Sequence, residues 1–180
     1  MPWHRLYIAV EGPDDSRFFG RIVRPLYEQQ NCEISLIEYA CMKREKRQAL
    51  IQGIRSMDDV GLLVVGDMDE AACFTLSKDR IRGSWNVGFG NEEILIVKQE
   101  IEAWYLATVD GTESRSLGFD HPGDTDNITK ERLERIRPRR FGSRLDFMLA
   151  LLDRASIQTG RQQNASLAYF LGRHPRRPGA

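Results

Sequence analysis

Cysteine and histidine are scarce in this chain of 180 residues, which contains three of each. Cys32, Cys41 and Cys73 are widely spaced and form no C-x-x-C pair, and the histidines do not cluster with them in sequence. We therefore expect neither a disulfide framework nor a zinc site. Small buried thiols in a reducing compartment are the simpler interpretation, which favours an intracellular, cytoplasmic protein.

Long apolar runs are also missing, because no run approaches the roughly 18 residues that a membrane-spanning helix needs. The first residues, MPWHRLYIAVEGPDD, reach acidic side chains too early for a signal peptide. We expect no membrane partner. The hydrophobic fraction of 41% is still enough for a packed core, so wholesale disorder is excluded.

A net charge is absent, since 26 basic residues balance 26 acidic ones, but the charges are unevenly distributed. Residues 128–180 carry 12 Lys and Arg against 4 Asp and Glu, whereas residues 1–127 carry 14 against 22. Either the arginines only solvate helix faces, or the basic part holds a polyanion while the acidic part holds cations. The predicted phosphate-contacting patch, which implies a nucleic-acid partner, consists of Arg137, Arg139, Arg140 and Arg144, with Arg161 as a further candidate.

Short apolar runs alternate with segments of helical periodicity over the first part of the chain. Strands are predicted at Leu6–Val10, Ile34–Tyr39, Gly61–Gly66 and Ile94–Val97. One predicted helix starts at Asp14 or Asp15 and runs through Leu26, and a second covers Lys43–Met57. Alternating strands and helices indicate a Rossmann-like α/β fold, with a mostly parallel open sheet of about four strands flanked by helices.

The rest of the chain is predicted to be helical apart from one long loop. Helices are expected at residues 101–107, 129–136, 143–155 and 166–171, a loop at 108–127 and a frayed tail at 174–180. We therefore divide the chain into an α/β domain, residues 1–108, and a loop with a helical C-terminal extension, residues 109–180, that packs on the same domain. The sequence is also compatible with a homo-oligomer.

Acidic side chains follow the ends of several predicted strands. Glu11 comes after the first strand, and Asp67 and Asp69 come after the apolar run GLLVVG. Ligands of open α/β sheets bind beyond the carboxyl ends of the strands, so these carboxylates are expected to converge. Crowded carboxylates need a compensating cation, and hard cations such as Mg²⁺ or Mn²⁺ prefer oxygen ligands. Such a site suits phosphoryl transfer.

Three segments resemble motifs of the TOPRIM superfamily. VEGPDDSRFF (Val10–Phe19) is similar to its first motif, V-E-G-x-x-D, and LLVVGDMDEA (Leu62–Ala71) to its apolar strand ending in Asp-x-Asp. VKQEIEAWYLA (Val97–Ala107) resembles a Glu-(Ile/Met)-Glu-Ala-Trp signature of small stand-alone TOPRIM-like proteins of unknown function. These proteins are related to the TOPRIM half of the OLD (overcoming lysogenisation defect) nucleases. The resemblance covers roughly residues 5–107.

The resemblance implies a role for each matching residue of the first two motifs. Glu11 matches a metal ligand or general acid/base, and Gly12 matches the glycine that permits a tight turn beside it. Asp67 and Asp69 match the metal-binding pair. Asp15 matches an acidic residue that helps to hold a second metal in OLD-type nucleases.

The third motif leaves alternatives open. Glu100 and Glu102 are two residues apart, so on a regular helix they do not share a face, and one of them is expected to add a metal ligand. Lys98 is a candidate catalytic residue that stabilises charge on a phosphate, or it only pairs with the carboxylates.

The leading hypothesis is a Mg²⁺- or Mn²⁺-dependent nuclease, or nuclease subunit, that hydrolyses phosphodiester bonds in DNA or RNA. The chain has no G-x-x-x-x-G-K-[ST] motif, so an ATP-driven step requires a separately encoded ATPase. A second hypothesis is a non-catalytic interaction or regulatory subunit of such an ATPase. A receiver-like or phosphatase protein is a third, disfavoured because dehalogenase-type phosphatases place D-x-D after the first strand rather than the third.

The chain also departs from the family in places. Glu70-Ala71-Ala72 follows the Asp-x-Asp pair where many TOPRIM sequences have a small residue and glycine. There is no room for a topoisomerase tyrosine domain and no zinc element of the primase kind.

Overall fold

The computed structural model describes residues 3–69 and 71–173, which form two compact units with the division between Ile96 and Val97. The predicted tail at 174–180 lies outside the described residues. Each unit is presented by itself below.

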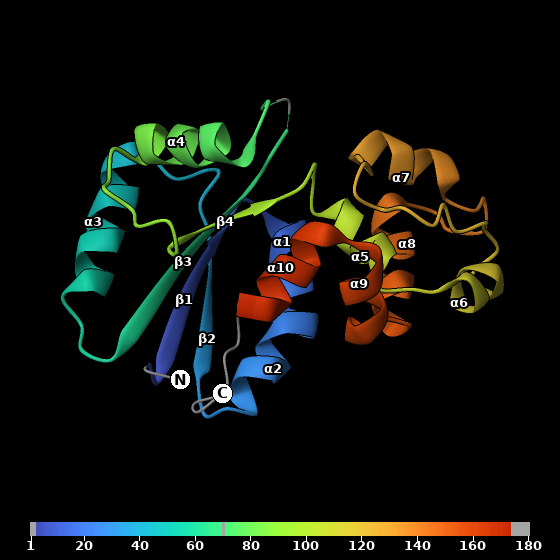
Figure 1. The fold of residues 1–180 in the computed structure, drawn as a ribbon, viewed down its shortest axis with the longest axis horizontal. Helices are drawn as coiled ribbons and strands as arrows, with labels where there is room; N and C mark the ends of the chain where they lie inside the picture. Colours follow the sequence, from blue (N-terminus) through green and yellow to red (C-terminus); the bar gives the residue numbers. More distant parts are fainter. Residues whose placement is uncertain (1–2, 70, 174–180) are drawn as a thin grey trace. The chain divides into compact units, whose positions relative to one another are not determined.

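The first unit is built on a four-stranded parallel sheet with the order β2-β1-β3-β4 (Figure 1). Its strands are β1 (Arg5–Val10), β2 (Glu33–Glu38), β3 (Val60–Asp67) and β4 (Ile94–Val97). β1 pairs in parallel with both β2 and β3. Val10 is opposite Glu38 and Ala9 is opposite Val64, so β1, β2 and β3 end at one edge of the sheet.

Helices cover both faces of this sheet. α3 (Arg44–Arg55) and α4 (Phe74–Trp85) lie on the opposite side from α1 (Pro13–Phe18) and α2 (Arg24–Glu28) (Figure 1). β3 is buried on both of its faces. Leu62 and Val64 pack into the core with α3 and α4, and the alternating residues Leu63 and Val65 are buried as well. A continuous apolar run is what a strand covered on both sides requires.

The helical segment predicted after the first strand is confirmed, with one irregularity. A π-helical stretch, η1 (Phe19–Val23), joins α1 to α2. Gly12 is the N-cap of α1 and Pro13 its first residue, where the missing N–H of proline is not needed. Asp15, predicted as a possible cap, accepts the N–H of Gly12 at 3.2 Å from within the first turn.

The second unit is helical. Its elements are α5 (Glu102–Ala107), α6 (Gly111–Ser116), α7 (Lys130–Ile136), α8 (Arg144–Asp153), α9 (Ile157–Gln163) and α10 (Ala165–Arg173). Side-chain caps explain four starting points: Asp110, Thr129, Ser143 and Ser156 accept first-turn N–H groups of α6, α7, α8 and α9.

The second unit departs from the sequence predictions in two helices and in the boundary. The expected loop at 108–127 contains α6, which Asp110 caps, and α9 was not predicted because Ile157 is its only large apolar residue. The predicted division followed residue 108, whereas α5 belongs to the second unit because it is buried along its length and packs against α7, α8 and α9. Within residues 3–69 and 71–173, no helix is long and apolar enough to cross a bilayer.

Candidate functional site

Glu11 stands where β1 ends. The backbone carbonyl of Glu11 accepts the N–H of Ala40 at 3.1 Å, which ties it to the segment after β2. The chain then turns at Gly12 into α1. The half-buried Glu11 side chain is therefore presented at the carboxyl edge of the sheet, as the sequence predicted.

Asp67 and Asp69 follow from the same strand end, and the residue between them explains their placement. Met68 packs against the hydrophobic core, whereas Asp67, the last residue of β3, is only half-buried. Asp69 has φ of +46°, a left-handed conformation that aspartate tolerates better than most residues. Its side chain is 54% exposed and lies 4.0 Å from a guanidinium nitrogen of Arg80 on α4.

The electrostatics link these residues. Burial raises the pKa of Glu11, and the charge of Asp69 raises it further, while hydrogen bonds from Tyr39 and from the backbone of Asp67 act in the opposite direction. A carboxylate whose ionisation is opposed by burial and by a second negative charge is the kind of group that a divalent cation would stabilise.

Asp15 belongs to the same neighbourhood. It is 5% exposed, and its charge, with those of Glu11 and Asp67, contributes to the raised pKa of Tyr39. Glu11, Asp15, Asp67 and Asp69 therefore lie in one neighbourhood. Asp14 instead has Arg17 on α1 as its ion-pair partner.

Tyr39 is a site residue that the sequence analysis treated only as the end of a strand. Its hydroxyl donates to the carbonyl of Val65 at 2.8 Å and lies 3.3 Å from Oε1 of Glu11. Burial is the main reason why its pKa is raised, followed by the charge of Glu11. Its position in the sequence could have indicated this role. Tyr39 comes directly after β2, at the edge of the sheet where Glu11 follows β1 and Asp67 ends β3.

The donor atoms fit a hard divalent cation, since carboxylate oxygens are the ligands that Mg²⁺ and Mn²⁺ prefer. Over the described ranges, no three Asp, Glu, His or Cys side chains are already grouped as a metal site. The carboxylate of Asp69 lies 4.0 Å from a guanidinium nitrogen of Arg80 rather than beside the other carboxylates. The chemistry of the set therefore fits the metal, and its assembly requires side-chain movement.

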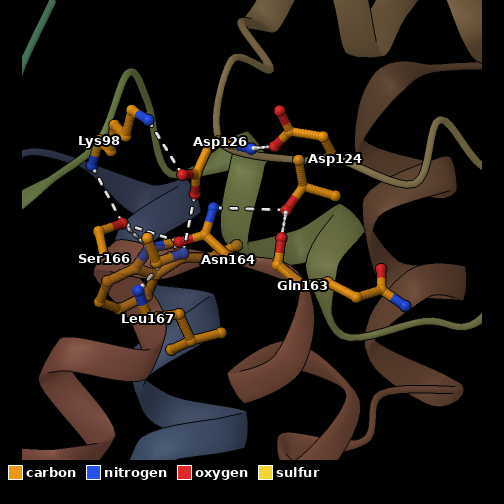
Figure 2. A network of polar contacts seen from close by, with 10 residues as sticks. Lys98, Asp124, Asp126, Gln163, Asn164, Ser166 and Leu167 are labelled. Atoms are coloured by element: carbon orange, nitrogen blue, oxygen red, sulfur yellow. Dashed lines mark hydrogen bonds and ion pairs between the residues drawn. The ribbon is translucent and has the colours of Figure 1, made fainter.

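Lys98, in the second unit, is fixed by a network of polar contacts (Figure 2). Its ammonium lies 2.9 Å from a carboxylate oxygen of Asp126, and its backbone N–H donates to the hydroxyl of Ser166 at 3.2 Å. The same hydroxyl accepts the indole N–H of Trp104 and donates to Asn164, both at 2.8 Å. Lys98 therefore pairs with Asp126, which is not one of the carboxylates considered in the sequence analysis, and its role as a catalytic residue stays a prediction.

Glu100 and Glu102 are also in the second unit. The carboxylate of Glu100 accepts the backbone N–H of Lys130 at the start of α7. Glu102 is 4% exposed and forms an ion pair with Arg144 of α8. The expectation that the two residues differ in direction is in keeping with these separate partners, and their role as metal ligands stays a prediction.

Most arginines of the predicted nucleic-acid patch have partners within the second unit. Arg137 pairs with Glu134 and donates to the carbonyl of Phe141, and Arg140 donates to the carbonyl of Ser116 at 3.0 Å. Arg144 is engaged by Glu102. Arg139 is exposed and makes no ion pair or hydrogen bond within the part of the chain that the structure describes.

Comparison of the chain with protein-family models, with curated proteins and with solved structures found no significant match. The four-stranded parallel sheet flanked by helices is compatible with a Rossmann-like fold. The TOPRIM assignment made from the motifs stays a prediction.

Proposed function

We propose that the chain is a TOPRIM-type nuclease, or the nuclease subunit of a complex, that hydrolyses phosphodiester bonds in DNA or RNA with Mg²⁺ or Mn²⁺. The observation that carries this proposal is the group of carboxylates at the carboxyl edge of the first unit's sheet. There, burial and the charge of Asp69 both raise the pKa of Glu11.

In this proposal Asp67 and Asp69 hold the cation, and Glu11 contributes a further oxygen. A cation bound there would neutralise phosphate oxygens and lower the pKa of water. Asp15 stabilises the turn between β1 and α1 through the N–H of Gly12, which keeps Glu11 at the edge of the sheet. Burial raises the pKa of Glu11, which is the direction that makes a carboxylate a better proton acceptor.

The proposed nucleic-acid contacts come from the basic second unit. The excess of positive charge in residues 128–180 supports binding of a polyanion. Arg139 is the best-placed member of the predicted patch, because its guanidinium is exposed and does not face an acidic partner within the described second unit.

The test is cleavage of supercoiled plasmid and of labelled single-stranded DNA and RNA with Mg²⁺ or Mn²⁺. The key variant is Asp69→Asn, which removes the charge while asparagine retains the ability to adopt positive φ. Its matched control is Asp59→Asn, because Asp59 precedes the other end of β3 and has φ of +52°. We expect at least a 100-fold loss of cleavage for Asp69→Asn and no change for Asp59→Asn.

Equal activity of both variants would refute the proposed site. A folded wild-type protein that cuts none of these substrates would refute cleavage by the isolated chain. That result would favour the alternative function, a non-catalytic regulatory subunit of an ATPase.

A further inference from the structure

Tyr39 is held in place both by its backbone and by the packing of its ring. Its backbone N–H donates to the carbonyl of Val10 at 2.9 Å, which extends the pairing of β2 with β1 by one residue. The ring is buried and meets the ring of Trp85 edge-on, with centroids 4.9 Å apart. Trp85, on α4, is itself fully buried, so the position of the hydroxyl is determined by the core.

The hydroxyl of Tyr39 has one proton and two acceptors. The carbonyl of Val65 can only accept, and it lies at 2.8 Å, a short distance for a hydrogen bond. Oε1 of Glu11 lies at 3.3 Å, the weaker branch of the same contact. The strand carbonyl therefore anchors the hydroxyl, and the hydroxyl in turn anchors one oxygen of Glu11.

Gly66 lies beside this contact. A Cβ at residue 66 would lie 3.4 Å from the hydroxyl oxygen of Tyr39 and 3.6 Å from Oε1 of Glu11. It would also lie 2.9 Å from Cδ1 of Ile81, which is closer than real Cβ contacts. A methyl group at this position would therefore touch the hydroxyl and the carboxylate at ordinary contact distances, and its steric conflict would be with Ile81.

We infer that Tyr39 is a positioning residue of the proposed metal site, which orients the carboxylate of Glu11 before a cation binds. The hydroxyl acts together with the backbone N–H of Asp67, the other donor to this carboxylate. These donors come from β3 and from the residue after β2, so the sheet itself sets the direction of Glu11. The inference rests on the proposed function, because it names the residue that prepares the proposed ligand.

The test variant is Tyr39→Phe, which keeps the buried ring and removes only the hydroxyl. Its matched control is Tyr7→Phe, because Tyr7 is on the neighbouring β1 and its hydroxyl contacts Arg5 and Met57 rather than a site residue. Groups that orient a metal ligand typically change metal affinity by 10- to 100-fold. We therefore expect Tyr39→Phe to weaken Mn²⁺ binding about tenfold, measured by electron paramagnetic resonance of the metal alone, and Tyr7→Phe to leave it unchanged.

The cleavage assay gives a second measurement that a purely structural role would not change in the same way. At low Mn²⁺ the kcat of Tyr39→Phe should fall about tenfold, saturating Mn²⁺ should restore it, and KM for nucleic acid should stay constant.

The outcomes separate this inference from the proposed function. A wild-type protein that binds Mn²⁺ without cutting nucleic acid refutes the nuclease, while the affinity ratio still decides the role of Tyr39. Equal Mn²⁺ affinity of Tyr39→Phe and wild type overturns the positioning role even if both cut. A wild type that binds no Mn²⁺ overturns both.

Discussion

Around Glu11 in the first unit the nearby charges are mostly negative, whereas around Arg144 in the second unit a buried carboxylate meets a guanidinium. Burial raises the pKa of Glu11, and the charge of Asp69 raises it further. The carboxylate of Glu102, although more deeply buried, is compensated by the guanidinium of Arg144. The first arrangement costs stability and suits a ligand, whereas the second leaves no buried charge uncompensated and is costly to break.

The same contrast applies to the positive charges of the second unit. The sequence shows a dense run of arginines from Arg137 to Arg144, which suggests a continuous surface for phosphate. In the structure, Arg137 and Arg144 have carboxylate partners, so charge density in the sequence overstates the charge available to a ligand. The following predictions test this distinction between compensated and uncompensated charge.

The largest effect is expected for Glu102→Gln. This change removes the negative charge from the buried partner of Arg144, and breaking a buried ion pair typically costs about 3–5 kcal/mol. Urea unfolding should show a loss of about 3 kcal/mol. The control Glu134→Gln removes an exposed partner of Arg137 and should leave the unfolding midpoint unchanged.

A double variant, Glu102→Gln with Arg144→Gln, sharpens this test. It should recover part of the lost stability, because no uncompensated charge remains. If Glu102→Gln is as stable as the wild type, the pair is not structural, and the predicted role of Glu102 as a metal ligand becomes the better explanation of its burial.

Much of the first unit could be predicted from local sequence patterns. Each of the four strands is a short apolar run, and Glu11 and the Asp67–Asp69 pair follow strand ends directly. Parallel strands that end at one edge bring such residues together without further information. This is why the acidic cluster was expected before the structure.

The partners of these residues could not be predicted in the same way, because they depend on contacts that are distant in sequence. Tyr39 and Glu11 are 28 residues apart, and Arg144 and Glu102 are 42 apart. Nothing in the local pattern around Arg144 shows that a buried carboxylate will meet it. Helices α6 and α9 were missed for a related reason, since their polar sequences are defined by the caps Asp110 and Ser156 rather than by apolar periodicity.

Glu11→Gln is expected to raise stability, by less than Glu102→Gln lowers it. Because the folded-state pKa of Glu11 is raised, the stability that it contributes is present below its unfolded pKa and is lost as pH rises through the folded value. At pH 7 the amide should therefore raise Tm, by no more than about 2 °C because solvent screens a carboxylate that is only half-buried. The gain should vanish towards pH 4, as measured by thermal unfolding across pH.

Added Mg²⁺ should raise the Tm of the wild type above that of Glu11→Gln, because a ligand that binds only the folded state stabilises it. The wild type is expected to gain Tm with Mg²⁺ and Glu11→Gln to gain less. The control Glu33→Gln, at the other end of the sheet and paired with Arg5, should show no rise in Tm at pH 7. A rise of equal size in both variants would mean that the effect is not specific to the acidic edge.

The smallest effect is expected for Arg139→Ala, which should weaken single-stranded DNA binding in EDTA and reduce the slope of log affinity against log salt by about one. Its matched control is Arg137→Ala, whose guanidinium is already compensated by Glu134 and by the carbonyl of Phe141 and should change the slope less. Equal slopes for the two variants would show that the patch binds as a whole or not at all. A difference in the expected direction would mean that intramolecular partners, rather than the number of arginines, determine which positive charges reach a phosphate.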